Sequence, residues 1–186
     1  AGHQVLIITS GAVAAGRSIY QFQKKTDTVV QRQVLASIGQ VKLISLYKEV
    51  FDKQEIICSQ VLVTKEDFKS RNHYLNMKNC LSALLNNHIV PVINENDVIS
   101  VTELMFTDND ELAGLVSAMM NTDILIILTK DLTFYDFWRF RGSRYRWGSR
   151  GSNGRRDLGG SWGSRIWWGR CLLLMRFCQL LWNYNG

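Results

Sequence analysis

Continuous apolar runs alternate along the first two thirds of the chain with segments in which apolar residues recur every three or four positions. The first pattern is typical of strands buried on both faces, and the second predicts amphipathic helices. Strands are predicted over residues 4–9, 56–64, 89–93 and 123–129. Helices are predicted over residues 12–17, 28–51, 65–87 and 111–120, with Gly39 expected to weaken the middle of the second. This alternation predicts an α/β fold with a mostly parallel sheet between helices.

Polar residues follow three of the predicted strands at their carboxyl ends. The clusters are Thr9-Ser10-Gly11, Asn94 to Asp97, and the residues from Thr129 onward. Ligands of open α/β sheets bind beyond the carboxyl ends of the strands. We therefore expect these clusters to line one cleft.

Each cluster also has an interpretation without a ligand. Ser10-Gly11 suits a turn and a helix N-cap, which the residue types alone favour over ligand binding. Asn94 to Asp97 is evenly balanced between a solvated loop and a functional cluster, because a loop needs fewer than four consecutive amide and carboxylate side chains. Asp108 and Asp110 are interpreted as caps of the helix that follows them.

The clusters offer amides, carboxylates and backbone N–H groups, but no nucleophile paired with a base. Such groups in one cleft suit recognition of a zwitterion such as an amino acid, which would itself attack in the reaction. The three histidines are scattered and the four cysteines have no CxxC spacing, so we predict no metal site and a reduced, cytoplasmic protein. The first residues do not read as a signal peptide, and no apolar run reaches the roughly 18 residues of a membrane span, so no membrane association is expected.

The amino-acid composition changes abruptly near residue 132. Nine Lys and three Arg stand against fourteen acidic residues up to that point, a net charge of −2, whereas ten Arg and two acidic residues follow it, a net charge of +8. All six Trp and nine of the fourteen Gly also lie after residue 132. We therefore predict a domain over residues 1–132 and an Arg/Gly/Trp-rich tail over residues 133–186 that is not part of the fold.

Three interpretations of this tail remain open. Interleaved arginine, glycine and aromatic residues suit a nucleic-acid-binding segment. A disordered extension is the second interpretation, although six tryptophans and the run CLLLMRFCQLLW are costly to leave in water. A shift of the coding frame is the third. It is favoured over nucleic-acid binding because Gly, Trp and Arg all have G-rich codons.

Five segments carry a resemblance to a known family. They are VLIITSGAVAAGR (5–17), QVLASIGQVKLISLYKEVF (33–51), SQVLVTKEDFKSRNHYLNMKNCLSALL (59–85), IVPVINENDVISV (89–101) and FTDNDELAGLVSAMMNTDILIILT (106–129). These segments resemble the glutamate 5-kinases of the amino-acid-kinase family, which use ATP to phosphorylate the γ-carboxylate of glutamate in the first step of proline biosynthesis. The resemblance implies an amino-acid-kinase fold over residues 1–132, incomplete at both ends. It also implies L-glutamate and ATP as ligands, Mg²⁺ as a cofactor, and a homo-oligomer.

The resemblance assigns roles to individual residues. Ser10 of TSGA, Asp97 at the end of INEND and Asn109 of DND would bind glutamate. Thr129 and Lys130 would belong to the nucleotide site. No catalytic base is implied, because the γ-carboxylate is already a nucleophile at neutral pH and the enzyme has only to hold it in line with ATP.

The chain departs from the family pattern at three points. The family's first strand, with its lysine-bearing loop for the ATP phosphates, is not found. Lys130 stands where the family has an acidic residue, and the later glycine-rich loop of the ATP site has no counterpart after residue 132. We therefore expect the chain to carry the glutamate half of the site and to have weak or no kinase activity. The alternative is an inactive kinase-like domain whose arginine-rich tail binds nucleic acid.

Overall fold

The computed structural model describes residues 2–23, 27–100, 109–128, 135–139 and 170–175. The helices in these ranges are α1 (Ala12–Arg17), α2 (Thr28–Asp52), α3 (Lys65–Lys69), α4 (Arg71–Asn86) and α5 (Asn109–Met120). The strands are β1 (Gln4–Thr9), β2 (Cys58–Val63), β3 (Val90–Glu95), β4 (Ile124–Leu128), β5 (Tyr135–Arg139) and β6 (Arg170–Met175).

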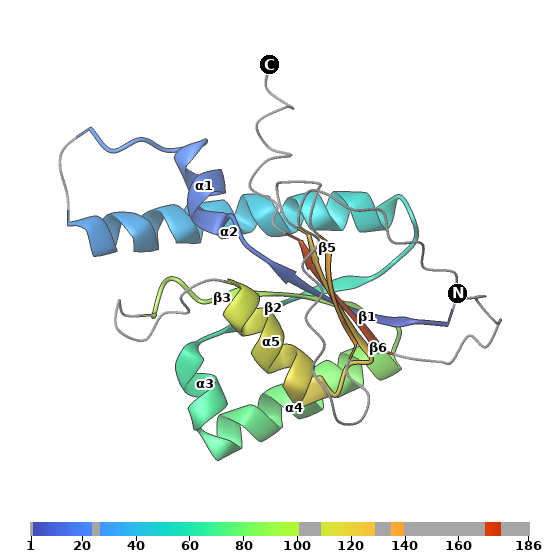
Figure 1. Cartoon of the computed structure of the whole chain (residues 1–186). Coiled ribbons are helices and arrows are strands. Elements are labelled where there is room, and N and C mark those ends of the chain that lie inside the picture. Colours follow the sequence, from blue (N-terminus) through green and yellow to red (C-terminus); the bar gives the residue numbers. More distant parts are fainter. Residues whose placement is uncertain (1, 24–26, 101–108, 129–134, 140–169, 176–186) are drawn as a thin grey trace, which may run out of the picture.

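The strands form one sheet in the order β2-β3-β1-β6-β4-β5. All neighbouring pairs are parallel except β4 and β5, which are antiparallel. Helices α1 and α2 cover one face of the sheet, and α3, α4 and α5 lie on the other (Figure 1). The predicted α/β fold, with a mostly parallel sheet between helices, is confirmed.

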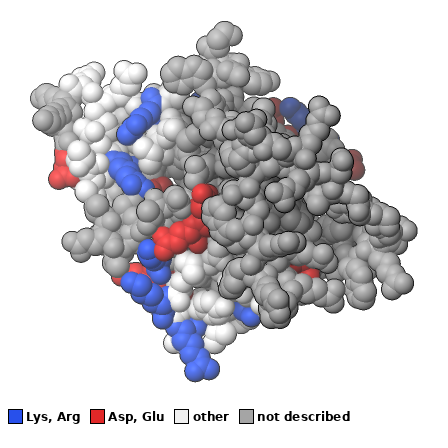
Figure 2. Space-filling model, viewed as in Figure 1, with Lys and Arg blue, Asp and Glu red and all other residues white. Residues whose placement is uncertain are grey.

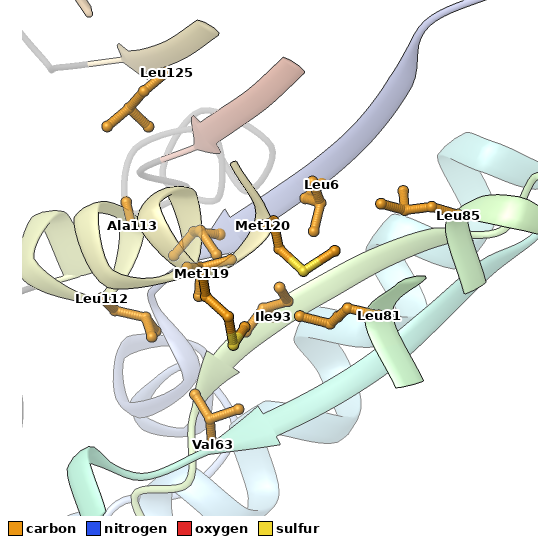
Figure 3. Packing of buried hydrophobic residues seen from close by; sticks show 12 residues of the cluster. Leu6, Val63, Leu81, Leu85, Ile93, Leu112, Ala113, Met119, Met120 and Leu125 are labelled. Carbon is orange, nitrogen blue, oxygen red and sulfur yellow. The ribbon is translucent and has the colours of Figure 1, made fainter. Parts of the chain in front are cut away.

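Strand β1 is buried between the two helical layers, and its successive side chains face opposite sides. Leu6 and Ile8 belong to a core formed with α4 and α5, whereas Ile7 belongs to a second core formed with α1 and α2. Figure 3 shows the first core, in which Met119 of α5 lies beside Ile93 of β3. Burial on both faces explains why the sequence of β1 is continuously apolar rather than alternating.

The prediction of a single helix over residues 65–87 is wrong in one respect, because the structure has two helices there, α3 and α4, which meet at Ser70. Ser70 has an extended backbone (φ −80°, ψ 118°), and its hydroxyl accepts a hydrogen bond from the His73 N–H at the start of α4. Thr64 and Asp67 form a capping box at the start of α3. Two N-caps six residues apart favour two helix starts, which the apolar spacing alone does not reveal.

Two glycines let α1 and α2 pack closely. A Cβ at Gly39 would lie 1.7 Å from the carbonyl oxygen of Ala12, and a Cβ at Gly16 would lie 1.9 Å from that of Leu35. Helix α2 runs unbroken from Thr28 to Asp52, so the expected weakness at Gly39 does not interrupt it. The glycines instead bring α1, which follows β1 directly, against the middle of α2.

Two segments of the predicted tail are strands of the sheet. Strand β5 is an antiparallel edge strand, and β6 lies between β1 and β4, with Leu173 in register with Ile7 on one side and Ile126 on the other. These segments differ from the expectation that the tail is not part of the fold. A short apolar run such as that of β6 suits an interior strand, which gives a physical reason for the difference. The domain boundary near residue 132 stays a prediction.

Charges of both signs share the described part of the molecular surface. Figure 2 shows basic and acidic side chains interspersed on one face. Two largely exposed ion pairs lie at the C-terminal end of α2, Lys48 with Asp52 and Lys53 with Glu49. The two partners of each pair are four residues apart, which is about one helical turn. Among the helices that the structure describes, none has the length and apolar character needed to cross a membrane.

Candidate functional site

A pocket of about 510 Å³ lies at the carboxyl ends of β1 and β3, between α1, the first turns of α2 and the start of α5. This is the edge at which sheets of this kind bind ligands. Ser10, Asp97 and Asn109, the three residues predicted to bind substrate, all line it. Thr129 and Lys130, predicted for the nucleotide site, lie outside the described residues.

The turn after β1 forms one wall of the pocket. Gly11 has a left-handed backbone (φ 105°, ψ 5°), which glycine adopts without steric cost. It occupies the N-cap position of α1, and no side chain caps that helix. The interpretation of Ser10-Gly11 as a turn and helix N-cap is therefore confirmed, with Gly11 at the cap position, and Ser10 also lines the pocket.

Two buried hydroxyl groups, those of Tyr47 and Thr9, connect helix α2 to this turn by hydrogen bonds. The Tyr47 hydroxyl of α2 donates a hydrogen bond to Thr9 Oγ1 at 2.9 Å, and Thr9 Oγ1 donates to the Ser10 carbonyl at 3.3 Å. Burial raises the pKa of Tyr47 to about 12, although its hydrogen bond with Thr9 acts in the opposite direction. The phenol therefore stays protonated at neutral pH and remains a donor.

The polar stretch from Asn94 to Asp97 begins inside the sheet. Strand β3 continues through Asn94 and Glu95, whose exposed fractions are 3% and 6%. Asn94 Nδ2 donates to Gln40 Oε1 of α2 at 3.0 Å. The interpretation as a solvated loop is therefore wrong for Asn94 and Glu95, and the predicted strand over residues 89–93 ends two residues too early.

Asp97 forms an ion pair with Arg32 of α2. Arg32 Nε and Nη2 both donate to Asp97 Oδ1, at 3.2 and 2.8 Å. The Asp97 side chain is 11% exposed, whereas that of Arg32 is 45% exposed. The neighbouring Gln33 donates from Nε2 to the Val98 carbonyl at 2.8 Å. The N-terminal part of α2 therefore holds the segment that follows β3.

Asn109 joins the start of α5 to the end of β1. Its Nδ2 donates to the Thr9 carbonyl oxygen at 2.5 Å. Asp110 and Glu111 follow in the first turn of α5, where carboxylates interact favourably with the helix dipole. Glu111 also pairs with Lys65 of α3 at 2.6 Å. Asp110 thus lies in the first turn of α5, and its capping role stays a prediction, whereas Asp108 lies outside the described residues.

The sequence prediction missed two charged residues that line the pocket, Arg17 and Arg32. Together with Glu95 and Asp97 of the predicted polar cluster, they place two basic and two acidic side chains around it, a set that suits a ligand carrying both signs of charge. No signal in a single sequence pairs Arg32 with Asp97, because 65 residues separate them.

A divalent cation in the pocket would need oxygen, nitrogen or sulfur donors from the surrounding side chains. Among the residues described, no group of three or more His, Cys, Asp or Glu side chains could hold a metal ion. Mg²⁺ in kinases keeps several water ligands and takes one or two carboxylates together with nucleotide phosphates. Two carboxylates, those of Glu95 and Asp97, line the pocket.

Comparison with known proteins identifies relatives over the first part of the chain. The sequence model of the amino acid kinase family matches residues 1–136. A glutamate 5-kinase of Bacteroides thetaiotaomicron is 55% identical over 128 residues, and one of Chlorobaculum tepidum is 52% identical over 128 residues; each match covers 69% of this chain and 36% of the relative. A glutamate 5-kinase of Thermoanaerobacter sp. strain X514 is 45% identical over 135 residues, which cover 73% of this chain and 36% of the relative. The chain thus spans about a third of these relatives, and it belongs to the amino acid kinase family.

Proposed function

We propose that the chain is part of a glutamate 5-kinase and that its pocket binds L-glutamate, whose γ-carboxylate ATP then phosphorylates in the first step of proline biosynthesis. One observation carries this proposal. Ser10, Asp97 and Asn109 come from three separate segments, and all three line the same pocket. The relatives named glutamate 5-kinase, at 43% to 55% identity, support it.

The pocket suits a reaction that depends on positioning. A glutamate γ-carboxylate is a nucleophile at neutral pH, so the protein need not supply a base. Asp97 would contact the substrate ammonium group, and Ser10 and Asn109 would donate hydrogen bonds to its carboxylates. Holding the γ-carboxylate in line with the transferring phosphoryl group replaces a bimolecular encounter with an oriented complex, a large contribution to rate.

ATP is the proposed phosphoryl donor and Mg²⁺ the proposed counter-ion. When bound, Mg²⁺ offsets the negative charge of the transferring phosphoryl group. Thr129 and Lys130 remain the proposed nucleotide residues. The resemblance further implies a homo-oligomer that works in the cytoplasm. We do not favour nucleic-acid binding by the tail, because two of its segments, β5 and β6, pair within the sheet.

Calorimetric titration of L-glutamate into the 186-residue chain tests the glutamate half of this proposal. We expect saturable binding, and an affinity at least about tenfold lower for Asp97→Asn, since the variant loses a charge-assisted hydrogen bond to the ammonium group. The proposal fails if wild-type chain does not bind L-glutamate or if Asp97→Asn binds it equally well. Glutamate-dependent ADP release measures turnover, which we expect to be weak because Lys130 replaces an acidic residue of the family.

A further inference from the structure

The Arg32–Asp97 pair uses one edge of the guanidinium group. Nε and Nη2 both point to the single oxygen Asp97 Oδ1, at 3.2 and 2.8 Å. A guanidinium carries five N–H donors, so this ion pair leaves three of them, on Nη1 and Nη2, for another acceptor. Those donors form the end-on edge, which binds carboxylates through two parallel hydrogen bonds.

The accessibility of the two side chains differs. Arg32 lines the pocket with 45% of its side chain exposed, whereas Asp97 is 11% exposed. Gln33 holds the backbone at Val98, so the segment that carries Asp97 has a second attachment to α2. A pair with one exposed partner contributes little to stability. Its position in the pocket lining therefore suits recognition better than stabilisation.

An α-amino acid presents an ammonium and a carboxylate group on one carbon atom. Asp97 and Arg32 present the complementary charges side by side in one pocket. We propose that Arg32 binds the α-carboxylate of the substrate while Asp97 binds its ammonium group, so that the pair recognises the zwitterionic head. This inference rests on the proposed function. It also has a chemical consequence: the head is anchored at the pair, and the γ-carboxylate is left as the group that ATP can reach.

Calorimetric titration with two ligands isolates the contribution of the α-carboxylate to binding affinity. The ligands are L-glutamate and L-glutamic acid α-amide, which differ in charge only at that group. We expect wild-type chain to bind L-glutamate about 10- to 100-fold more tightly than the α-amide, the usual range for a hydrogen bond to a charged group. Arg32→Gln should bind the two ligands with affinities within about threefold of each other. Arg32→Lys should fall between these, because it keeps the charge and loses the fork geometry.

Lys48→Gln is the matched control. It removes one positive charge from an exposed ion pair on the same helix, away from the pocket lining, and should leave both affinities unchanged. A thermal melt by circular dichroism verifies the fold of each variant, and Arg32→Lys decides the question if Arg32→Gln does not fold.

The possible outcomes separate this inference from the proposed function. If Arg32→Gln lowers both affinities by the same factor, Arg32 merely positions Asp97 and the inference is wrong, although glutamate still binds. The inference also fails if the variants keep the wild-type preference for L-glutamate. If wild-type chain binds neither ligand, the proposed function and this inference fall together.

Discussion

Tyr47 donates a hydrogen bond to Thr9 Oγ1 at 2.9 Å, and both side chains are buried. This contact joins the C-terminal part of α2 to the last residue of β1, directly before the Ser10-Gly11 turn. The same helix holds the opposite wall of the pocket through Arg32 and Asp97. Helix α2 therefore sets the separation of the two strand ends between which the pocket lies.

Replacing Tyr47 by Phe tests the first of these contacts. The variant removes the phenolic oxygen and leaves Thr9 Oγ1 buried without that donor, so the free energy of unfolding should fall by about 0.5–1.5 kcal/mol. Urea unfolding measures the change. Tyr20→Phe is the control, because Tyr20 is 46% exposed and its replacement should change stability by no more than about 0.5 kcal/mol. Equal effects of the two replacements would contradict the account.

The raised pKa of Tyr47 predicts a loss of stability at alkaline pH. The unfolded chain releases this proton near the ordinary pKa of 10.0, whereas the folded chain holds it up to about 12. The contribution of Tyr47 is therefore fully present below pH 10 and is lost as the pH rises toward 12, by at most about 1.4 kcal/mol per pH unit. Urea midpoints at pH 9, 10 and 11 should fall more steeply for wild type than for Tyr47→Phe. Parallel curves would show that Tyr47 does not cause the loss.

The close packing of α1 on α2 predicts opposite effects for alanine at two helical glycines. At Gly39 the new Cβ would lie 1.7 Å from a backbone oxygen, so the variant should be destabilised by about 1–3 kcal/mol or more. At Gly114 of α5 the new Cβ meets nothing within 4 Å, so Gly114→Ala should be stabilised by about 0.5–1 kcal/mol. Thermal melts of the two variants measure both shifts. A stable Gly39→Ala chain would contradict the helix packing.

The pairing of β6 within the sheet predicts slow hydrogen exchange of its backbone amides, although β6 lies in the Arg/Gly/Trp-rich tail. Residues Arg170–Met175 pair with β1 on one side and β4 on the other, so hydrogen exchange there should be far slower than in an unstructured chain. Exchange monitored by mass spectrometry on peptides that cover residues 170–175 measures this. Peptides from β3, which is paired with β1 and β2, serve as the protected reference. Exchange at the unstructured rate would place this segment outside the sheet.

Much of the fold was predictable because burial leaves a local pattern. The continuous apolar runs located β1, β3 and β4, and the helical spacing located α2 to within one residue at its end. The pattern failed at Ser70, where capping overrides apolar spacing, and at Asn94, which is polar yet buried in a strand. Strand β6 was not predicted, although its apolar run was noted in the sequence, because the Arg, Gly and Trp content around it decided the interpretation of the tail.

The candidate site was predictable from motif resemblance more than from residue chemistry. Ser10 and Asp97 were ambiguous as isolated residues, and the combined motifs assigned them to one ligand. Helix α2 was predicted from the spacing of its apolar residues, and that spacing says nothing about the role of Arg32, a charged residue in the same helix. Its pairing with Asp97 depends on how α2 crosses the sheet, and a single sequence does not contain that distance.

The central claim is that Ser10, Asp97 and Asn109 form one glutamate pocket, and a crystal structure of the chain with L-glutamate tests it most directly. The account predicts ligand density in the pocket at the ends of β1 and β3, with the ammonium nitrogen about 2.7–3.2 Å from the Asp97 carboxylate. Glutamate bound elsewhere, or bound here with its ammonium group turned away from Asp97, would contradict the account.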